Sequence, residues 1–216
     1  MSTINEILNL QRKKRIGIMG GTFDPIHQGH LVTAETARSK FSLEKVIFVP
    51  SGHPPHKKGK VISNKEARYL MTVLATSGNP YFEVSRVELD RPGESYAIDT
   101  VRYFRSKMEE GSELFFITGA DAILEIVNWK CVEELFDRCT FIAATRPGFD
   151  LGVLRDKLLE KLSVDYLYKI IPLEVPAMAI SSTDIREKIK KNHTIKYLLP
   201  VEVENFIYKN NLYKFE

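Results

Sequence analysis

Residues 15–30 read "RIGIMGGTFDPIHQGH" and join a short apolar burst to a loop with two adjacent glycines, a proline and two histidines. The apolar "RIGIM" predicts a buried strand. The residues "HLVTAETARSKF" have helical spacing, and Gly29 and His30 open that helix. A buried strand, a glycine-containing loop and a helix in this order predict the first half of a βαβ unit, and therefore a parallel sheet.

The rest of the chain repeats this alternation. We expect strands at 45–50, 81–89, 113–119, 139–147 and 168–175, and helices at 64–78, 95–110, 121–127, 151–162, 181–192 and 200–211. Pro172 predicts that the last strand is edge-like, and Ser63 with Glu66 predicts a capping box. The fold class is therefore α/β, a doubly wound, mostly parallel, Rossmann-like sheet in a single domain. Ligands of such sheets bind beyond the carboxyl ends of the strands.

Composition limits the function classes. A chain of 216 residues fits one domain of ordinary size. The net charge of +3 is too small to indicate a nucleic-acid-binding protein, and no apolar run approaches the ~20 residues of a membrane helix. We therefore expect neither nucleic acid nor a membrane as a partner. Cys131 and Cys139 are expected to be reduced thiols.

The first residues predict an extension of the domain. Ile4, Ile7 and Leu8 share one helical face, so residues 1–13 are expected to carry a short N-terminal helix and residues 14–216 to form the domain. The basic "QRKKR" follows these apolar residues, whereas a secretory signal has the reverse order. The predicted compartment is the cytoplasm.

Four of the five histidines form two pairs with HxxH spacing, His27 with His30 and His53 with His56. Each pair follows a predicted strand, so both are expected at one edge of the sheet. One interpretation is a metal site, but the two prolines in "HPPH" disfavour a helix there, and Asp24 is a rare acidic neighbour. The other interpretation, which the loop favours, is a phosphate site.

The loop after the first strand has the chemistry of a phosphate site. Gly20 and Gly21 allow the backbone to approach a ligand, and the free N–H groups at the start of a helix favour an anion. His27 and His30 lie one turn apart, so both can face that anion and stabilise its charge. Lys57 adds a cation from the loop after the second strand. The sequence here matches neither GxGxxG nor a Walker loop, so the phosphate is held by a third arrangement.

A second phosphate-binding group is predicted in "AISSTDIREK", residues 179–188. Ser181 and Asp184 predict a capping box. Arg186 opposes the helix dipole, a small cost that vanishes when an anion lies at the helix start. Ser182 is four residues before Arg186 and shares its face. Two such groups at one edge of the sheet suit a triphosphate.

These two segments together resemble the HxGH nucleotidyltransferases, with His27 to His30 as the HxGH residues. Five further segments narrow the resemblance to the bacterial nicotinate-nucleotide adenylyltransferases: "PPHK" (54–57), "SYAIDT" (95–100), "FFITGAD" (115–121), "NWK" (128–130) and "TRPGF" (145–149). The similarity spans roughly residues 14–213. Ala97 departs from the family, which often has threonine there.

The resemblance implies a reaction in which ATP and nicotinate mononucleotide give nicotinate adenine dinucleotide and pyrophosphate, with Mg²⁺ accompanying ATP. It implies charge stabilisation by His27, His30 and Arg186 as catalytic residues. The residues it implies for ATP are Gly20, Gly21, Thr22, Phe23, His27, His30, Lys57, Ser181, Ser182, Thr183 and Arg186. Those for nicotinate mononucleotide are Ser95, Tyr96, Asp99, Thr100, Gly119, Asp121 and Trp129, of which Trp129 would stack on the nicotinate ring. It implies no metal ligand from the protein.

Several alternatives stay open from the sequence. Within the class, the enzyme could prefer nicotinamide mononucleotide or be another HxGH nucleotidyltransferase. From other classes, a non-catalytic nucleotide-binding protein and a metallohydrolase built on the four histidines are the alternatives. A homo-oligomer is compatible with the sequence.

Overall fold

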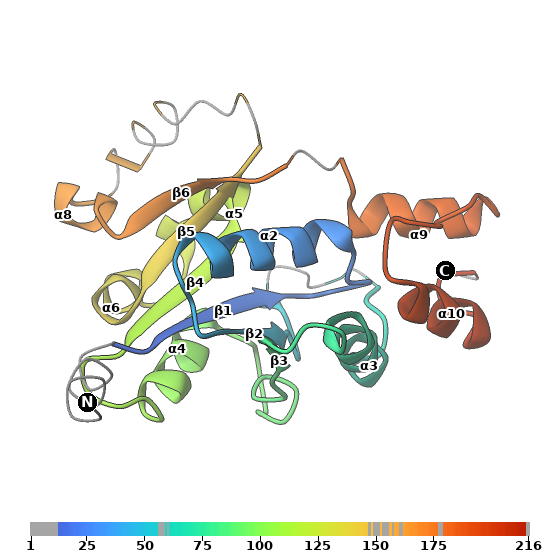
Figure 1. Ribbon diagram of the computed structural model, residues 1–216, viewed down its shortest axis with the longest axis horizontal. Helices are drawn as coiled ribbons and strands as arrows, with labels where there is room; N and C mark the ends of the chain where they lie inside the picture. Colours follow the sequence, from blue (N-terminus) through green and yellow to red (C-terminus); the bar gives the residue numbers. More distant parts are fainter. Residues whose placement is uncertain are drawn as a thin grey trace, which may run out of the picture.

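The computed structural model describes residues 13–55, 59, 61–146, 148, 152, 156, 158–159, 162–176 and 179–214 (Figure 1). The expected N-terminal helix lies outside the described residues, as do His56, Lys57 and most of the helix expected at 151–162. No helix in the described part of the chain is long and apolar enough to cross a membrane.

A six-stranded sheet organises the molecule, and all its neighbouring strands are parallel. The strands are β1 (Arg15–Gly21), β2 (Lys45–Pro50), β3 (Phe82–Val84), β4 (Glu113–Gly119), β5 (Thr140–Thr145) and β6 (Ile170–Glu174). Their order is β3-β2-β1-β4-β5-β6, so the direction of winding reverses between β1 and β4. This arrangement confirms the predicted fold class and places Pro172 on an edge strand.

Helices cover both faces of the sheet. They are α2 (Gln28–Lys40), α3 (Lys65–Thr76), α4 (Ala97–Arg105), α5 (Ala120–Leu124), η2 (Ile126–Asn128), α6 (Val132–Arg138), α8 (Val164–Leu167), α9 (Ser182–Lys190) and α10 (Val201–Lys209). Helices α2, α3, α9 and α10 bury their apolar residues on one face, whereas α4, α5 and α6 bury theirs on the other. Helices α3, α9 and α10 lie together beyond the tips of β1 and β2 (Figure 1).

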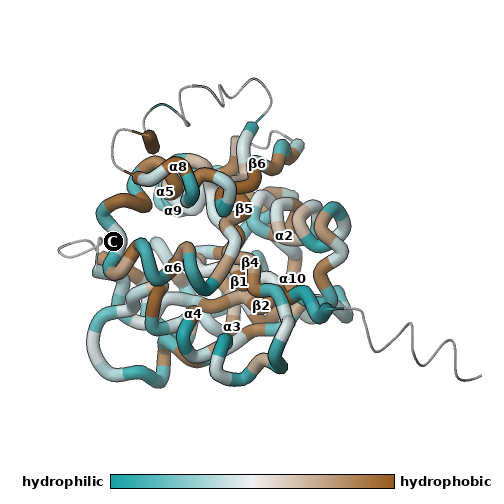
Figure 2. The backbone as a smooth tube through the Cα atoms, turned by 90° about the vertical axis from the view of Figure 1, so that its left-hand side faces the viewer, coloured by the Kyte–Doolittle hydropathy of each residue, from teal (hydrophilic) through white to brown (hydrophobic). Residues whose placement is uncertain are grey.

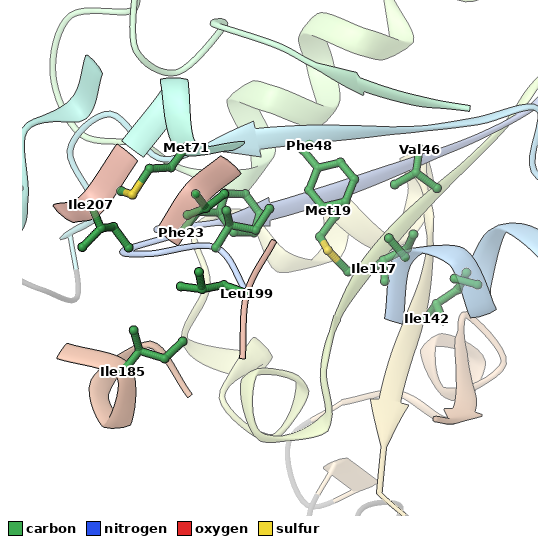
Figure 3. Close-up of a cluster of buried hydrophobic side chains, with 14 of the residues drawn as sticks. Met19, Phe23, Val46, Phe48, Met71, Ile117, Ile142, Ile185, Leu199 and Ile207 are labelled. Atoms are coloured by element: carbon green, nitrogen blue, oxygen red, sulfur yellow. The ribbon is translucent and has the colours of Figure 1, made fainter. Parts of the chain in front are cut away.

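Alternate residues of each strand enter the two cores, as a pleated strand requires. Met19 of β1 and Ile117 of β4 pack with α2 and α9, and Figure 3 shows them beside Phe23 and Phe48. Their neighbour Ile18 packs on the opposite face with α4 and α6. Because both faces are covered, the buried middle of β1 and of β2 is apolar, and brown segments mark both strands in Figure 2.

Three sequence-based expectations differ from the structure. The strand expected at 81–89 spans only Phe82–Val84. The capping box of Ser63 and Glu66 is wrong, because Asn64 caps α3 by accepting the Glu66 N–H at 2.8 Å. Ser63 instead bonds to the loop after β1: its N–H donates to Asp24 at 3.3 Å. Helix α6, which carries part of the second core, was not anticipated.

The substitution Phe136→Ala tests the packing of the core on the face of the sheet that α4, α5 and α6 cover. The Phe136 side chain is fully buried, and its ring centroid lies 5.2 Å from that of Phe141 and 5.0 Å from that of Tyr166. We expect Phe136→Ala to lower the free energy of unfolding by about 3–5 kcal/mol, because it leaves a cavity. Urea unfolding measures this, with the 80% exposed Tyr168→Ala as control. A loss below about 1 kcal/mol, the range of surface substitutions, would contradict the packing described.

Candidate active site

A cleft of about 550 Å³ opens beyond the carboxyl ends of β1, β4 and β5, where the winding of the sheet reverses. This is the place at which parallel sheets bind ligands. Five of the predicted site residues line it: Gly20, His27, His30, Gly119 and Asp121. The structure thus brings the end of β1, the start of α2 and the start of α5 to one cavity.

The two glycines at the end of β1 are required by packing. A Cβ on Gly20 would lie 3.2 Å from the Phe116 ring, and a Cβ on Gly21 would lie 2.8 Å from the Phe23 ring. Phe23 itself has a φ of 50° and is only 2% exposed, because its ring turns into the core toward Phe48 (Figure 3). Phe23 can therefore reach a nucleotide only through its backbone.

Arg68 of α3 fixes the loop that follows. Its guanidinium donates to the Thr22 carbonyl at 2.7 Å, to the Ser63 carbonyl at 3.1 Å and to the Gly52 carbonyl at 3.4 Å. The residue is 1% exposed. Burial lowers the pKa of Arg68, but an arginine stays charged at neutral pH. A single buried cation thus ties the loop after β1 to the loop after β2.

Asp24, in the same loop, is held by groups from the C-terminal part of the chain. Its carboxylate accepts the Tyr213 hydroxyl at 2.8 Å, and its backbone carbonyl accepts Arg186 at 2.7 Å. The Ser182 hydroxyl donates to the Pro25 carbonyl at 2.8 Å. The start of α9 therefore lies directly against the loop after β1, as the two predicted phosphate-binding groups require.

These contacts refine the predicted roles of the α9 residues. Ser181 caps α9 by accepting the Asp184 N–H at 3.0 Å. The Ser182 hydroxyl hydrogen is used by Pro25, so this residue has its backbone N–H left for an anion. Arg186 holds Asp24 with one terminal nitrogen and contacts the Thr183 hydroxyl with the other at 3.3 Å.

The two histidines of the HxGH motif stack at the start of α2. Their ring centroids are 3.8 Å apart, and the Nδ1 atom of His30 accepts the backbone N–H of His27 at 3.2 Å. Because that Nδ1 is an acceptor, the neutral His30 ring carries its proton on Nε2. The Nδ1 atom of His27 is buried and has no hydrogen-bond partner among the described residues. Buried polar atoms normally have partners, so this nitrogen is an exception among the buried groups of the site.

Both imidazoles are neutral at pH 7 in the unliganded protein. Burial lowers the pKa of His27 to about 4. Burial, followed by the proximity of His27, lowers the pKa of His30 well below its usual value. Neutral rings still donate one N–H each, so they can stabilise phosphate oxygens without carrying a charge at rest.

The residues predicted for the mononucleotide divide into two groups. Gly119 and Asp121 lie in the cleft with the histidines. Trp129 packs edge-on against Phe116 and Phe141, with centroid distances of 5.8 and 6.2 Å. It remains partly exposed.

Four more predicted residues lie at the start of α4. The Lys130 ammonium lies 4.3 Å from the centroid of the Tyr96 ring. The Asp99 carboxylate accepts a hydrogen bond from the Arg102 guanidinium at 3.2 Å. Ser95 accepts the N–H groups of Gly52 and His53. Thr100 is 1% exposed, so its side chain is not accessible to a ligand.

Sequence reasoning missed several residues of the site. Thr33, Thr118, Thr145 and Arg146 line the cleft, and Arg68 and Tyr213 hold its loop. Thr118 and Thr145 stand at the carboxyl ends of predicted strands, which is the signal that could have found them. Among the described residues, no three histidine, cysteine, aspartate or glutamate side chains gather to hold a metal ion.

The loss of stability on acidification tests whether His27 is buried in its neutral form. The unfolded imidazole titrates near 6.5, whereas the folded pKa of His27 is about 4. Below about pH 6.5 the unfolded state therefore binds protons that the folded state does not. Between pH 7 and 5, we expect His27 to contribute a loss of roughly 1–2 kcal/mol of stability.

Urea unfolding at both pH values measures this loss, and His27→Asn should reduce it. The exposed His193→Asn is the control. An equal loss in the wild type and in the His27 variant would contradict a neutral, buried His27.

Comparison with known proteins agrees with this geometry. Residues 18–188 match the family model described as cytidylyltransferase-like. A probable nicotinate-nucleotide adenylyltransferase of Moorella thermoacetica is 59% identical over 203 residues, covering 94% of this chain and 93% of that protein. One from Thermoanaerobacter sp. is 54% identical over 207 residues, covering 95% and 97%.

Solved structures show the same fold. Plasmodium falciparum nicotinic acid mononucleotide adenylyltransferase complexed with NaAD superposes with a TM-score of 0.72 at 21% identity, covering 94% of this chain and 98% of that one. The same enzyme complexed with APC gives 0.70 at 20% identity, with the same coverage. The family-model match and the close relatives together establish the assignment: the chain belongs to the cytidylyltransferase-like family and, within it, to the nicotinate-nucleotide adenylyltransferases.

Proposed function

We propose that this enzyme transfers the AMP moiety of ATP to nicotinate mononucleotide, giving nicotinate adenine dinucleotide and pyrophosphate. The observation that carries the proposal is the pair of stacked, neutral histidines at the start of α2, which lines the cleft at the reversal point of the sheet. Family membership supports the choice of substrates.

The reaction needs little acid–base chemistry. The attacking 5′-phosphate of the mononucleotide is already ionised at pH 7, so no general base is required. Its oxygen attacks the α-phosphorus of ATP in line, and the bond to the β-phosphate oxygen breaks as pyrophosphate leaves. Catalysis then rests on positioning the phosphates and stabilising the charge that develops on their oxygens.

We assign that stabilisation to the two histidines and Arg186. His30 would donate its Nε2–H, and the neutral His27 ring, which also lines the cleft, would supply a second N–H. Arg186 and the N–H groups at the start of α9 would hold the β- and γ-phosphates. The backbone of Gly20 to Phe23, at the end of β1, would bind ATP. Lys57, in the loop after β2, would add a positive charge for its phosphates.

We propose Mg²⁺ as the ion that accompanies ATP and neutralises part of its triphosphate charge. The scarcity of grouped carboxylates in the described part of the chain favours an ion held mainly by phosphate oxygens.

Nicotinate mononucleotide would lie between the start of α5 and the start of α4. Asp121, which is exposed at the cleft, would accept a hydroxyl hydrogen from a ribose. Trp129, which is partly exposed and makes T-shaped contacts with Phe116 and Phe141, would stack on the nicotinate ring. Ser95, Tyr96, Asp99 and Thr100 would shape the rest of the pocket.

A direct assay tests the substrates. The purified enzyme with Mg-ATP and nicotinate mononucleotide should release pyrophosphate and form the dinucleotide in equal amounts. Nicotinamide mononucleotide, run in parallel, should give a lower kcat/KM. Equal use of both would favour the dual-substrate alternative, and no product from either would contradict the proposed function.

His30→Ala tests charge stabilisation. Removing one preorganised donor should lower kcat by roughly 10²–10³, as measured by pyrophosphate release. The exposed His193→Ala is the matched control and should retain the wild-type kcat. Near-normal turnover by His30→Ala would contradict the assigned role.

Trp129→Ala tests the nicotinate pocket. Loss of the ring surface should raise the KM for nicotinate mononucleotide and leave the KM for ATP nearly unchanged. Trp129→Phe, which keeps an aromatic ring, should recover part of the loss. Equal increases in both KM values would exclude stacking.

A further inference from the structure

A buried carboxyl that the mechanism does not use lies beneath the proposed mononucleotide pocket. Glu88 is 6% exposed and accepts the Thr100 hydroxyl at 2.5 Å. The Ser95 side chain also lowers the pKa of this carboxyl. Glu88 follows β3 in the chain, whereas Thr100 lies in α4 and Ser95 just before it, so the carboxyl joins a loop to the start of a helix.

Ser95 extends this network to the loop after β2. Its hydroxyl oxygen accepts the backbone N–H groups of Gly52 and His53, both at 3.0 Å. Its own N–H donates to the His53 carbonyl at 2.9 Å. Ser95 therefore holds the start of α4 to the loop after β2, and Thr100 holds α4 to Glu88.

The network is tightly built. A Cβ on Gly52 would lie 2.2 Å from the backbone carbonyl oxygen of Glu88, so the two loops touch and no larger residue fits. Burial raises the pKa of Glu88, and the nearby Asp99 acts in the same direction, whereas Arg91 and the two hydroxyl donors oppose them. Burying a carboxyl is costly, and the Thr100 hydroxyl and the nearby Arg91 offset that cost here.

We propose that Glu88 is a positioning residue for the mononucleotide: its carboxyl holds α4 through Thr100, and its backbone lies against Gly52 in the loop after β2. This inference rests on the proposed function, because it takes the start of α4 as part of the mononucleotide pocket. ATP is held elsewhere, by the loop after β1 and the start of α9. The position of Glu88 should therefore affect one substrate and spare the other.

Steady-state kinetics with each substrate varied in turn tests this. Glu88→Ala should raise the KM for nicotinate mononucleotide about tenfold, the effect of losing one to two hydrogen bonds. The KM for ATP should change less than about twofold. Glu88→Gln retains a side-chain oxygen for one hydroxyl and should recover part of the affinity.

Thr100→Val provides a second variant that keeps the shape of the buried side chain. It removes one donor to Glu88 and should raise the same KM about threefold. Thr72→Val is the matched control, because the Thr72 hydroxyl is equally buried but donates only to the Arg68 carbonyl within α3. If Glu88→Ala does not fold, Thr100→Val decides the outcome.

Two results would overturn the proposal: unchanged KM values in folded variants, or equal increases for ATP and the mononucleotide. The second result would mean that Glu88 serves only the general stability of the fold. Failure of the proposed function is distinguishable, since the wild-type enzyme would then form no dinucleotide from nicotinate mononucleotide.

Discussion

The buried Arg68 guanidinium sets the position of the catalytic loop, and the rest of the site depends on it. It donates hydrogen bonds to the carbonyls of Thr22, Gly52 and Ser63, and removing such a donor would leave these acceptors without it. Tyr213 and Arg186 hold the adjoining Asp24 from the other side. Since α2 begins only four residues after Asp24, fixing this loop fixes the helix N-terminus and both histidines.

A fixed loop with neutral donors suits a reaction in which the phosphate groups of the substrates carry the negative charge. Four anionic phosphate groups meet in the proposed complex, and the protein offers backbone N–H groups, two neutral imidazoles and a few cations. Neutral rings stacked 3.8 Å apart avoid the repulsion that two imidazolium ions would suffer. A bound triphosphate would favour their donor forms at no cost of rearrangement. Preorganised donors in a partly buried site are the most effective form of such stabilisation.

Sequence patterns predicted the elements that are buried on both faces. β2 and β4 match the expected 45–50 and 113–119 because their apolar runs are continuous. Helix α6 was missed because it is only seven residues long and rich in charge. The HxGH and "SSTDIR" segments were found because the spacing of their polar residues predicts groups that face a phosphate at the start of a helix. Arg68 resembles a solvated cation of an amphipathic helix, and Tyr213 meets Asp24 across 189 residues, so spacing could reveal neither.

The protonation of the two histidines in the unliganded enzyme tests this account most directly. Nitrogen-15 NMR of the histidine-labelled protein, titrated from pH 8 to pH 4, reports both the charge and the tautomer of each ring. We expect both rings to be neutral at pH 7, with a pKa of about 4 for His27 and a pKa well below the usual value for His30. We also expect His30 to carry its proton on Nε2. Titration of either ring at pH 6.5 or above would contradict this account.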